Sequence, residues 1–166
     1  MEAWADAFPN CADLEQYAAT IMKNPIKSGC SVVIAIRSSG LCSDDFLDTI
    51  KLSNTKNWFQ APGSPITTVL EHELKHNANT RWDSTYGMMD CLIELCLLVN
   101  YFLGLPNHCE LKKLKLSNWQ WIVLGNKHKI LDVPHVVHHL VSSEKQPHLG
   151  WLVPYFKLFM TGWEEL

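Results

Sequence analysis

The sequence lacks the features that mark membrane-spanning and exported chains. Its longest apolar stretch, LCLLVNYFLGL at 95–105, is too short to span a bilayer and contains Asn100. The first ten residues, MEAWADAFPN, include no basic segment followed by an apolar run, so we expect neither a signal peptide nor a transit peptide. These absences predict an intracellular protein without a membrane segment.

Cysteines are present, but no two of them have C-x-x-C spacing. The six are Cys11, Cys30, Cys42, Cys91, Cys96 and Cys109. Without that spacing, the sequence indicates neither a zinc ribbon nor a thioredoxin-like site. An intracellular chain should keep these thiols reduced, and we expect them to be buried or incidental.

Charge is sparse and nearly balanced. Charged residues make up 19% of the chain and the formal net charge is −3, which excludes a global electrostatic attraction to nucleic acid or to an anionic membrane. The hydrophobic content of 47% is typical of a globular protein. At 166 residues we expect residues 1–166 to form a single domain, as a piece of a larger protein.

What the chain does contain is a series of helical patterns and no convincing strand, which predicts an all-α fold. Residues 28–38 hold a β-branched run that fits a strand or a helix, and the polar flanks favour a helix. Asp13, Asp83 or Ser84, and the Ser117–Gln120 capping box are placed to begin helices. The expected helices are 13–23, 28–38, 44–51, 83 to about 103, 117–131, 134–141 and 152–163.

Helical spacing also assigns apolar faces to the later helices. The helix after Ser117 should bury a face made of Trp121, Leu124, His128 and Leu131. The last helix should bury a face made of Leu152, Phe156, Phe159 and Trp163. Four of the seven tryptophans fall at helical positions and are interpreted as core: Trp119, Trp121, Trp151 and Trp163.

The stretch EHELKH at 71–76 contains a complete H-E-x-x-H. On a helix, His72 and His76 could hold one Zn²⁺ while Glu73 acts as general base, and Glu94 lies at a suitable spacing for a third ligand. This supports a zinc metallopeptidase as a minor alternative. Lys75 places a positive charge inside the motif, and a five-residue pattern with two free positions arises often by chance. We therefore expect no bound metal and a polar, solvated segment here.

A second group of histidines, His135, His138 and His139, falls at i, i+3 and i+4 and could share one helix face. No thiol or acid with matching local spacing completes a metal site. Partly buried or surface histidines are the simpler interpretation.

The most specific feature is an ordered succession of motifs. NTRWDSTYGMM at 79–89 leads a long helix, LSNWQW follows at 116–121, and SSEKQP at 142–147 precedes a helix that contains Pro154. FLDTIKLSNTKNWFQAPG at 46–63 belongs to the same pattern. Together these segments make the chain similar to hAT-family DNA transposases, in the form of the hAT-like elements of mushroom-forming fungi.

That resemblance implies a particular part of a larger enzyme. A hAT transposase has an RNase H-like catalytic domain interrupted by a helical insertion, and three acidic residues bind Mg²⁺ or Mn²⁺ for cleavage and strand transfer. This chain resembles the insertion alone and lacks the motifs of those three acids, so the resemblance implies no enzyme activity and no cofactor. It also implies a nuclear location. Uncovered helix faces are expected to promote self-association.

The resemblance further points to Arg81 and Trp82 as DNA-contacting residues. In the family this tryptophan helps to hold a base displaced from the duplex, and an arginine can pair with phosphate. The simpler alternative is a packed tryptophan beside a solvated arginine. A basic face around Arg81, Lys112, Lys113 and Lys115 would favour DNA binding. The main functional alternative is a transposon-derived helical module that binds other proteins.

Overall fold

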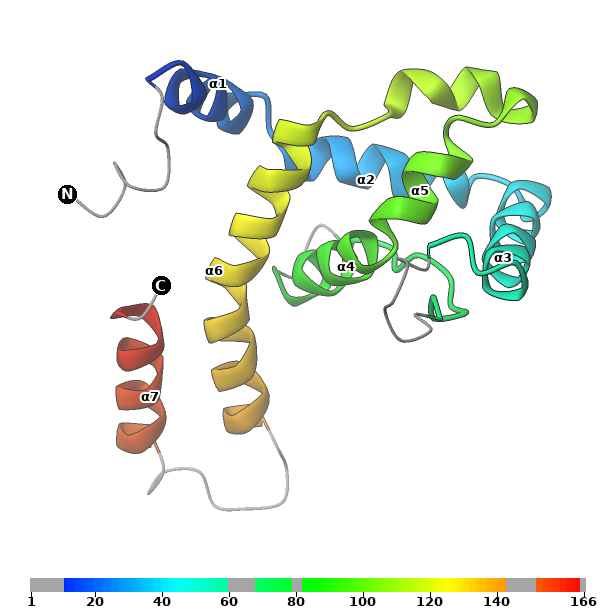
Figure 1. The fold of residues 1–166 in the computed structure, drawn as a ribbon. Coiled ribbons are helices and arrows are strands. Elements are labelled where there is room, and N and C mark those ends of the chain that lie inside the picture. The colour runs from blue at the N-terminus through cyan, green and yellow to red at the C-terminus, as the bar shows by residue number, and fades with distance from the viewer. Residues whose placement is uncertain (1–10, 60–67, 79–81, 143–151, 165–166) are drawn as a thin grey trace.

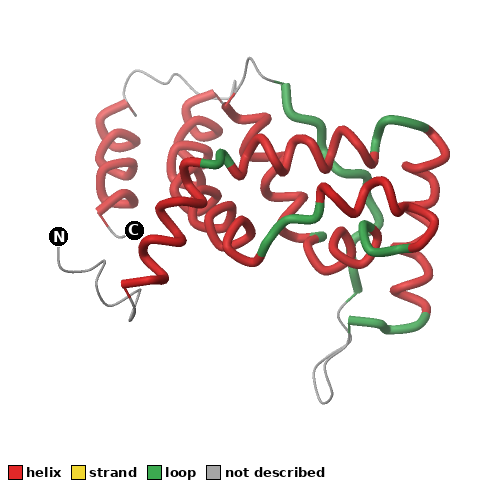
Figure 2. The backbone as a smooth tube through the Cα atoms, turned by 90° about the horizontal axis from the view of Figure 1, so that it is seen from above, coloured by secondary structure: helices red, strands yellow, loops and turns green. Residues whose placement is uncertain are grey.

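The computed structural model describes residues 11–59, 68–78, 82–142 and 152–164. Throughout these ranges the chain is helical or irregular, with no strand, so the predicted all-α class is confirmed (Figure 2). The described helices include none with the length and continuous apolarity needed to cross a bilayer.

Three helices open the described chain: α1 (Cys11–Met22), α2 (Pro25–Ile36) and α3 (Gly40–Thr55). All three were predicted, and the β-branched run is indeed helical. Their bounds differ, however, since α2 begins at Pro25 and α3 is twice as long as the expected 44–51. Asp13 lies in the first turn of α1 instead of capping it.

Local capping explains where α2 and α3 begin. Asn24 adopts a left-handed backbone with φ of 50°, and its side-chain oxygen accepts a hydrogen bond from the Lys27 amide at 3.3 Å. Pro25 follows at the first helical position, where a missing N–H costs nothing. Ser39 caps α3 by accepting from the Cys42 amide at 3.2 Å.

The prediction of one continuous helix over 83–103 is wrong. The chain forms α4 (Trp82–Glu94) and α5 (Cys96–Phe102), separated by a turn at Leu95. No glycine or proline marks this position. The bend lets α4 pack against α2 and α6 while α5 packs against α3, and tertiary packing of this kind overrides helix propensity.

After a 3₁₀ segment, η1 (Pro106–Leu114), comes the longest helix, α6 (Asn118–Ser142). Its capping box is confirmed, because the Ser117 amide donates to Gln120 Oε1 at 2.8 Å and the Gln120 amide donates to Ser117 Oγ at 3.2 Å. The prediction that one helix ends near Leu131 and a second begins at Pro134 is wrong. Pro134 lies inside a single 25-residue helix.

The last helix, α7 (Leu152–Glu164), begins just before Pro154. The proline therefore sits in the first turn, where it does not break the helix. The face predicted to be buried is not buried as a whole, because Phe156 is 64% exposed. The predictions that fall on Arg81, Trp151 and the side chains of Leu152 and Trp163 lie outside the described residues.

The helices form a core around α2, α4 and α5, with α6 along one side (Figure 1). α7 runs antiparallel to the second half of α6 (Figure 1). Apolar side chains from α2, α3, α4 and α5 fill the centre, and α6 adds Leu124. Trp121 and Leu131 pack against this core from the face that the sequence predicted.

The segment 68–78 has no regular secondary structure, yet several contacts fix it to the helices. Asn54 exchanges two hydrogen bonds of 2.8 Å with the backbone of Val69. Arg37 donates to the Leu74 carbonyl at 2.6 Å and pairs with Glu73 at 3.0 Å. Leu74 is buried in the core, so the expectation of a fully solvated segment is wrong here.

Candidate functional site

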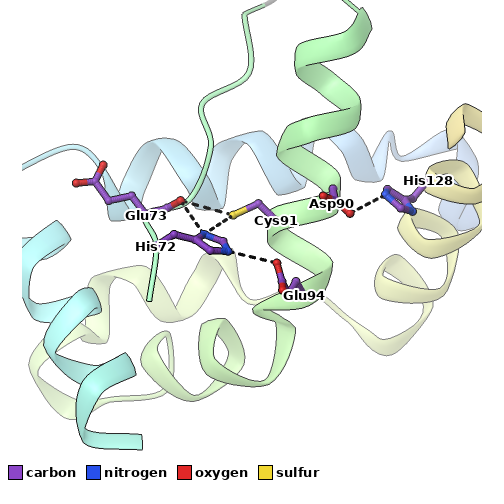
Figure 3. Close-up of polar contacts among 6 residues, drawn as sticks. All are labelled: His72, Glu73, Asp90, Cys91, Glu94 and His128. Atoms are coloured by element: carbon purple, nitrogen blue, oxygen red, sulfur yellow. Dashed lines mark hydrogen bonds and ion pairs between the residues drawn. The ribbon is translucent and has the colours of Figure 1, made fainter. Parts of the chain in front are cut away.

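The H-E-x-x-H lies on this irregular segment and not on a helix. His72 is placed against α4, where its Nε2 is 3.3 Å from Glu94 Oε2 and its Nδ1 is 3.4 Å from Cys91 Sγ (Figure 3). The carboxylate of Glu73 points away from this contact (Figure 3). It pairs instead with Arg37 at 3.0 Å. Within the described residues, His72, His76 and Glu94 do not bring three ligand atoms together, so the motif lacks the geometry of a zinc peptidase.

The contact from Cys91 through His72 to Glu94 has the order of a thiol nucleophile, a base and an orienting acid. Cys91, however, is only 1% exposed, and burial raises the pKa of its thiol. A reactive cysteine needs an accessible thiolate with a lowered pKa. This contact is therefore structural, and it holds the segment 68–78 on α4.

A second arrangement of titratable groups lies between α4 and α6. Asp90 points away from Cys91 and meets His128 of α6 at 3.1 Å (Figure 3). One and two turns earlier on α4 lie Tyr86 and Asp83, which face the second half of α6. Asp90 and Glu94, four residues apart on α4, thus have different partners, because Glu94 meets His72 of the segment 68–78 and Asp90 meets His128 of α6.

Asp83 completes the histidine group that local spacing left without an acid. Its Oδ1 lies 2.7 Å from His135 Nδ1 and 3.9 Å from His139 Nε2. One ligand atom from each of Asp83, His135 and His139 lies within 4.8 Å of the other two. Because Asp83 is in the first turn of α4, it does not cap the helix as the sequence suggested but reaches across to α6. His138 is not part of this convergence.

Aromatic stacking holds His135 in place. The Tyr86 ring stacks on His135 with centroids 3.9 Å apart, and its other neighbour is the His128 ring at 4.6 Å. The Tyr86 hydroxyl donates to Asp132 Oδ1 at 2.7 Å. Burial and this hydrogen bond raise the pKa of Tyr86, so the phenol stays protonated and keeps donating.

An open cavity of about 590 Å³ adjoins these groups. Asp83, His135 and His139 line it from the helices, and Lys75 and His76 line it from the segment 68–78. His76, the second histidine of the H-E-x-x-H, therefore faces a different environment from His72. The cavity is large enough for water or for a small polar ligand.

Trp82 begins α4 at the edge of this cluster. Its ring meets the rings of His138 and His135 edge-on, with centroids 5.4 Å and 6.5 Å away, and the residue remains 42% exposed. Its expected partner Arg81 lies outside the described residues. The ring is thus partly packed and partly exposed.

No protein-family model, curated protein or solved structure matches this chain.

The lysines of the expected basic face do not surround Trp82. Lys112, Lys113 and Lys115 are exposed near the start of α6, whereas His138, which touches Trp82, lies twenty residues along that helix (118 to 138). At about 1.5 Å of rise per residue, this separates them by roughly 30 Å. The rings that contact Trp82 are instead those of His135 and His138.

The spacing of polar residues in the sequence indicates the Asp83, His135 and His139 cluster. Asp83, Tyr86 and Asp90 recur at i, i+3 and i+7, and His128, Asp132, His135 and His139 recur with spacings of three and four. Two polar stripes of this kind on apolar helices indicate that the helices pack against each other through them. Their pairing across 52 residues of chain was not visible from local spacing.

Proposed function

We propose that this chain is a transposon-derived helical module, of the type that hAT-like transposases carry as an insertion, and that it associates with distorted DNA through Trp82. The motif order from Thr80 to Pro154 supports this relationship. The observation that carries the DNA role is the exposed ring of Trp82 at the first residue of α4. An exposed aromatic face can stack on an unpaired base.

Charge limits how strong this association can be. The net charge of −3 and the distant lysines favour weak binding, because the sequence-independent contribution grows with the number of phosphates neutralised. We therefore expect the chain to prefer DNA with an unpaired base, at low salt, over an intact duplex.

Fluorescence anisotropy at low salt tests this preference. A hairpin or unpaired-base oligonucleotide should bind better than a duplex, and Trp82→Ala should remove the difference at a cost of about 1–3 kcal/mol. Tyr101→Ala is a matched control, because Tyr101 is also 42% exposed but lies on α5, away from the cluster. Arg81→Ala should weaken binding to both DNAs and flatten the salt dependence.

Equal binding of the two DNAs by the folded wild-type chain would contradict the proposal. A loss in Tyr101→Ala as large as in Trp82→Ala would also contradict it. Circular dichroism of each variant separates a lost contact from a lost fold.

The proposal includes no catalytic activity for the chain by itself. Two-metal phosphoryl transfer needs several carboxylates that converge on paired ions, and the family's three acidic motifs are missing from the sequence. We expect no cleavage or strand transfer on transposon-end DNA with Mg²⁺ or Mn²⁺. Metal-dependent nicking that persists after further purification, and that follows the protein through it, would contradict this.

A specific observation favours the second candidate, a protein-interaction module. Three apolar residues form an exposed outer face on α7, here called the α7 outer face: Val153, Phe156 and Met160. Exposed apolar faces of this kind mark protein-binding surfaces.

A further inference from the structure

The pair of histidines on one helix face that a zinc site requires is absent from the H-E-x-x-H but present on α6. His135 and His139 are four residues apart on a regular helix, which places their imidazoles on the same face one turn apart. Their ring centroids lie 4.4 Å apart. Asp83 faces both of them from α4.

We propose that Asp83, His135 and His139 form a binding site for a divalent transition-metal ion of the zinc class. Two neutral imidazoles and one carboxylate are a frequent ligand set for such ions. This inference stands independently of the DNA proposal, and it replaces the sequence-based expectation of no bound metal.

The distances fit this ligand set. In a tetrahedral site with bonds of about 2.1 Å, ligand atoms lie roughly 3.4 Å from each other. The 2.7 Å from Asp83 Oδ1 to His135 Nδ1 and the 3.9 Å to His139 Nε2 fall on either side of that value. The ion takes the place of the proton now shared by Asp83 and His135, and a small rotation of the mostly exposed His139 closes the triangle.

Neighbouring side chains also hold the proposed metal ligands in place. Tyr86 stacks on His135 and is itself fixed by Asp132, so the imidazole cannot rotate freely. Outer partners of this kind orient metal-ligating histidines and raise affinity. On the open side, the cavity leaves room for a water ligand or for a fourth protein ligand, and His76 lines the same cavity.

Charge around the site is mixed but permits a cation. Asp83 and Asp90 line the cavity with negative charge, and Lys75 adds a positive charge to the same cavity wall. Asp83 is the one carboxylate of the ligand cluster itself, and Asp90 adds a second carboxylate on the cavity wall. These two carboxylates partly offset the charge of a divalent ion bound there.

Zinc binding by the full-length, tag-free and reduced chain tests this site. Equilibrium dialysis against buffered Zn²⁺, followed by elemental analysis, should give one Zn²⁺ per chain. His139→Gln and Asp83→Asn should each weaken binding by at least the about 10- to 100-fold that follows loss of even an outer partner. His138→Gln is the matched control, because it removes a neighbouring imidazole that does not converge on Asp83.

Several outcomes would overturn the proposal. The first is no retained Zn²⁺ in the folded wild-type chain. The second is unchanged affinity in His139→Gln, which would place the ion on thiols or elsewhere. The third is a loss of Zn²⁺ affinity confined to His72→Gln, which would assign the ion to the H-E-x-x-H. An equal loss in His138→Gln would assign the ion to a different ligand set.

A spectroscopic measurement gives a second readout that a purely structural role would not change. Co²⁺ bound to this site should produce the ligand-field absorption of a four-coordinate nitrogen and oxygen site, without a thiolate charge-transfer band. It should also quench the fluorescence of Trp82, whose ring centroid is 6.5 Å from that of His135. Thiolate absorption, or quenching that is unchanged in Trp82→Phe, would contradict the assignment.

Discussion

At the scale of single residues, histidines in the described chain meet carboxylates repeatedly. Four such pairs are His72–Glu94, His108–Asp45, His128–Asp90 and His135–Asp83. Partly exposed pairs contribute only about 0–1 kcal/mol each to stability. Their clearer consequence is orientation, because each carboxylate fixes the direction in which an imidazole nitrogen points.

Thiol accessibility gives a residue-scale prediction. Cys109 is exposed, whereas Cys91 is buried and burial raises the pKa of its thiol. Iodoacetamide at mildly alkaline pH should therefore label Cys109 rapidly and Cys91 only after unfolding, as read by peptide mass spectrometry at timed intervals. Cys109→Ser provides the control for the fast phase. Labelling of native Cys91 at the rate of Cys109 would refute its placement in the core.

Alkaline pH should destabilise the fold. Burial raises the pKa of Tyr86 from its ordinary 10.0 and those of Cys91 and Cys96 from 9.0. A group with a raised folded-state pKa stabilises the protein fully below its ordinary pKa, and that contribution is lost as the pH rises through the folded value. The free energy of unfolding should thus fall as the pH rises beyond about 9.

Denaturant titrations of the reduced protein across this range measure the effect. Tyr86→Phe keeps the ring stack but cannot ionise, so it should reduce the loss above the ordinary tyrosine pKa. A free energy of unfolding that stays constant through the same range would argue against a buried phenol and buried thiols.

At the scale of elements, helix presence was predictable and helix continuity was not. Capping residues such as Ser117 act within a few positions, so the sequence located the start of α6 correctly. The turn at Leu95 and the passage of α6 through Pro134 depend on which helices pack alongside. α6 has α4 and α7 as neighbours over its second half, and their packing offsets the hydrogen bond that Pro134 cannot make.

The candidate site was missed for the same reason. His135 and His139 were recognised as sharing a helix face, but their acid comes from α4, 52 residues earlier than His135. Conversely, the H-E-x-x-H matches a zinc-binding motif that requires a helix, and this segment does not form one. Local spacing predicts ligands only when one element carries all of them.

The capping box of α6 gives an element-scale prediction. Ser117→Ala removes the side-chain acceptor for the Gln120 amide and should lower stability by about 1 kcal/mol. For a chain of this length, that shift lowers Tm by roughly 2–4 °C. Ser31→Ala is the control, because Ser31 bonds back to the Lys27 carbonyl inside α2 and caps nothing. Equal effects of the two changes would contradict a capping role.

At the scale of the whole molecule, some helices supply the hydrophobic core and α7 lies outside it. α2, α3, α4 and α5 supply the core cluster, whereas α7 packs mainly on α6 and contributes no side chain to that cluster among the residues described. Lys112, Lys113 and Lys115 lie before the start of α6, whereas the contact between Asp83 and His135 lies at its second half.

The α7 outer face should therefore make the isolated chain self-associate. Val153 is 77% exposed and Phe156 is 64% exposed. Fully burying either side chain in an interface stabilises the complex by about 1.5–3 kcal/mol. Light scattering at tens of micromolar should show dimers or larger species, and Phe156→Glu should shift the population towards monomer. Leu41→Glu is the matched control, since Leu41 is an exposed apolar residue near the start of α3 and does not belong to the α7 outer face. A compact wild-type monomer at these concentrations, or an equal response to both changes, would show that this face does not mediate self-association.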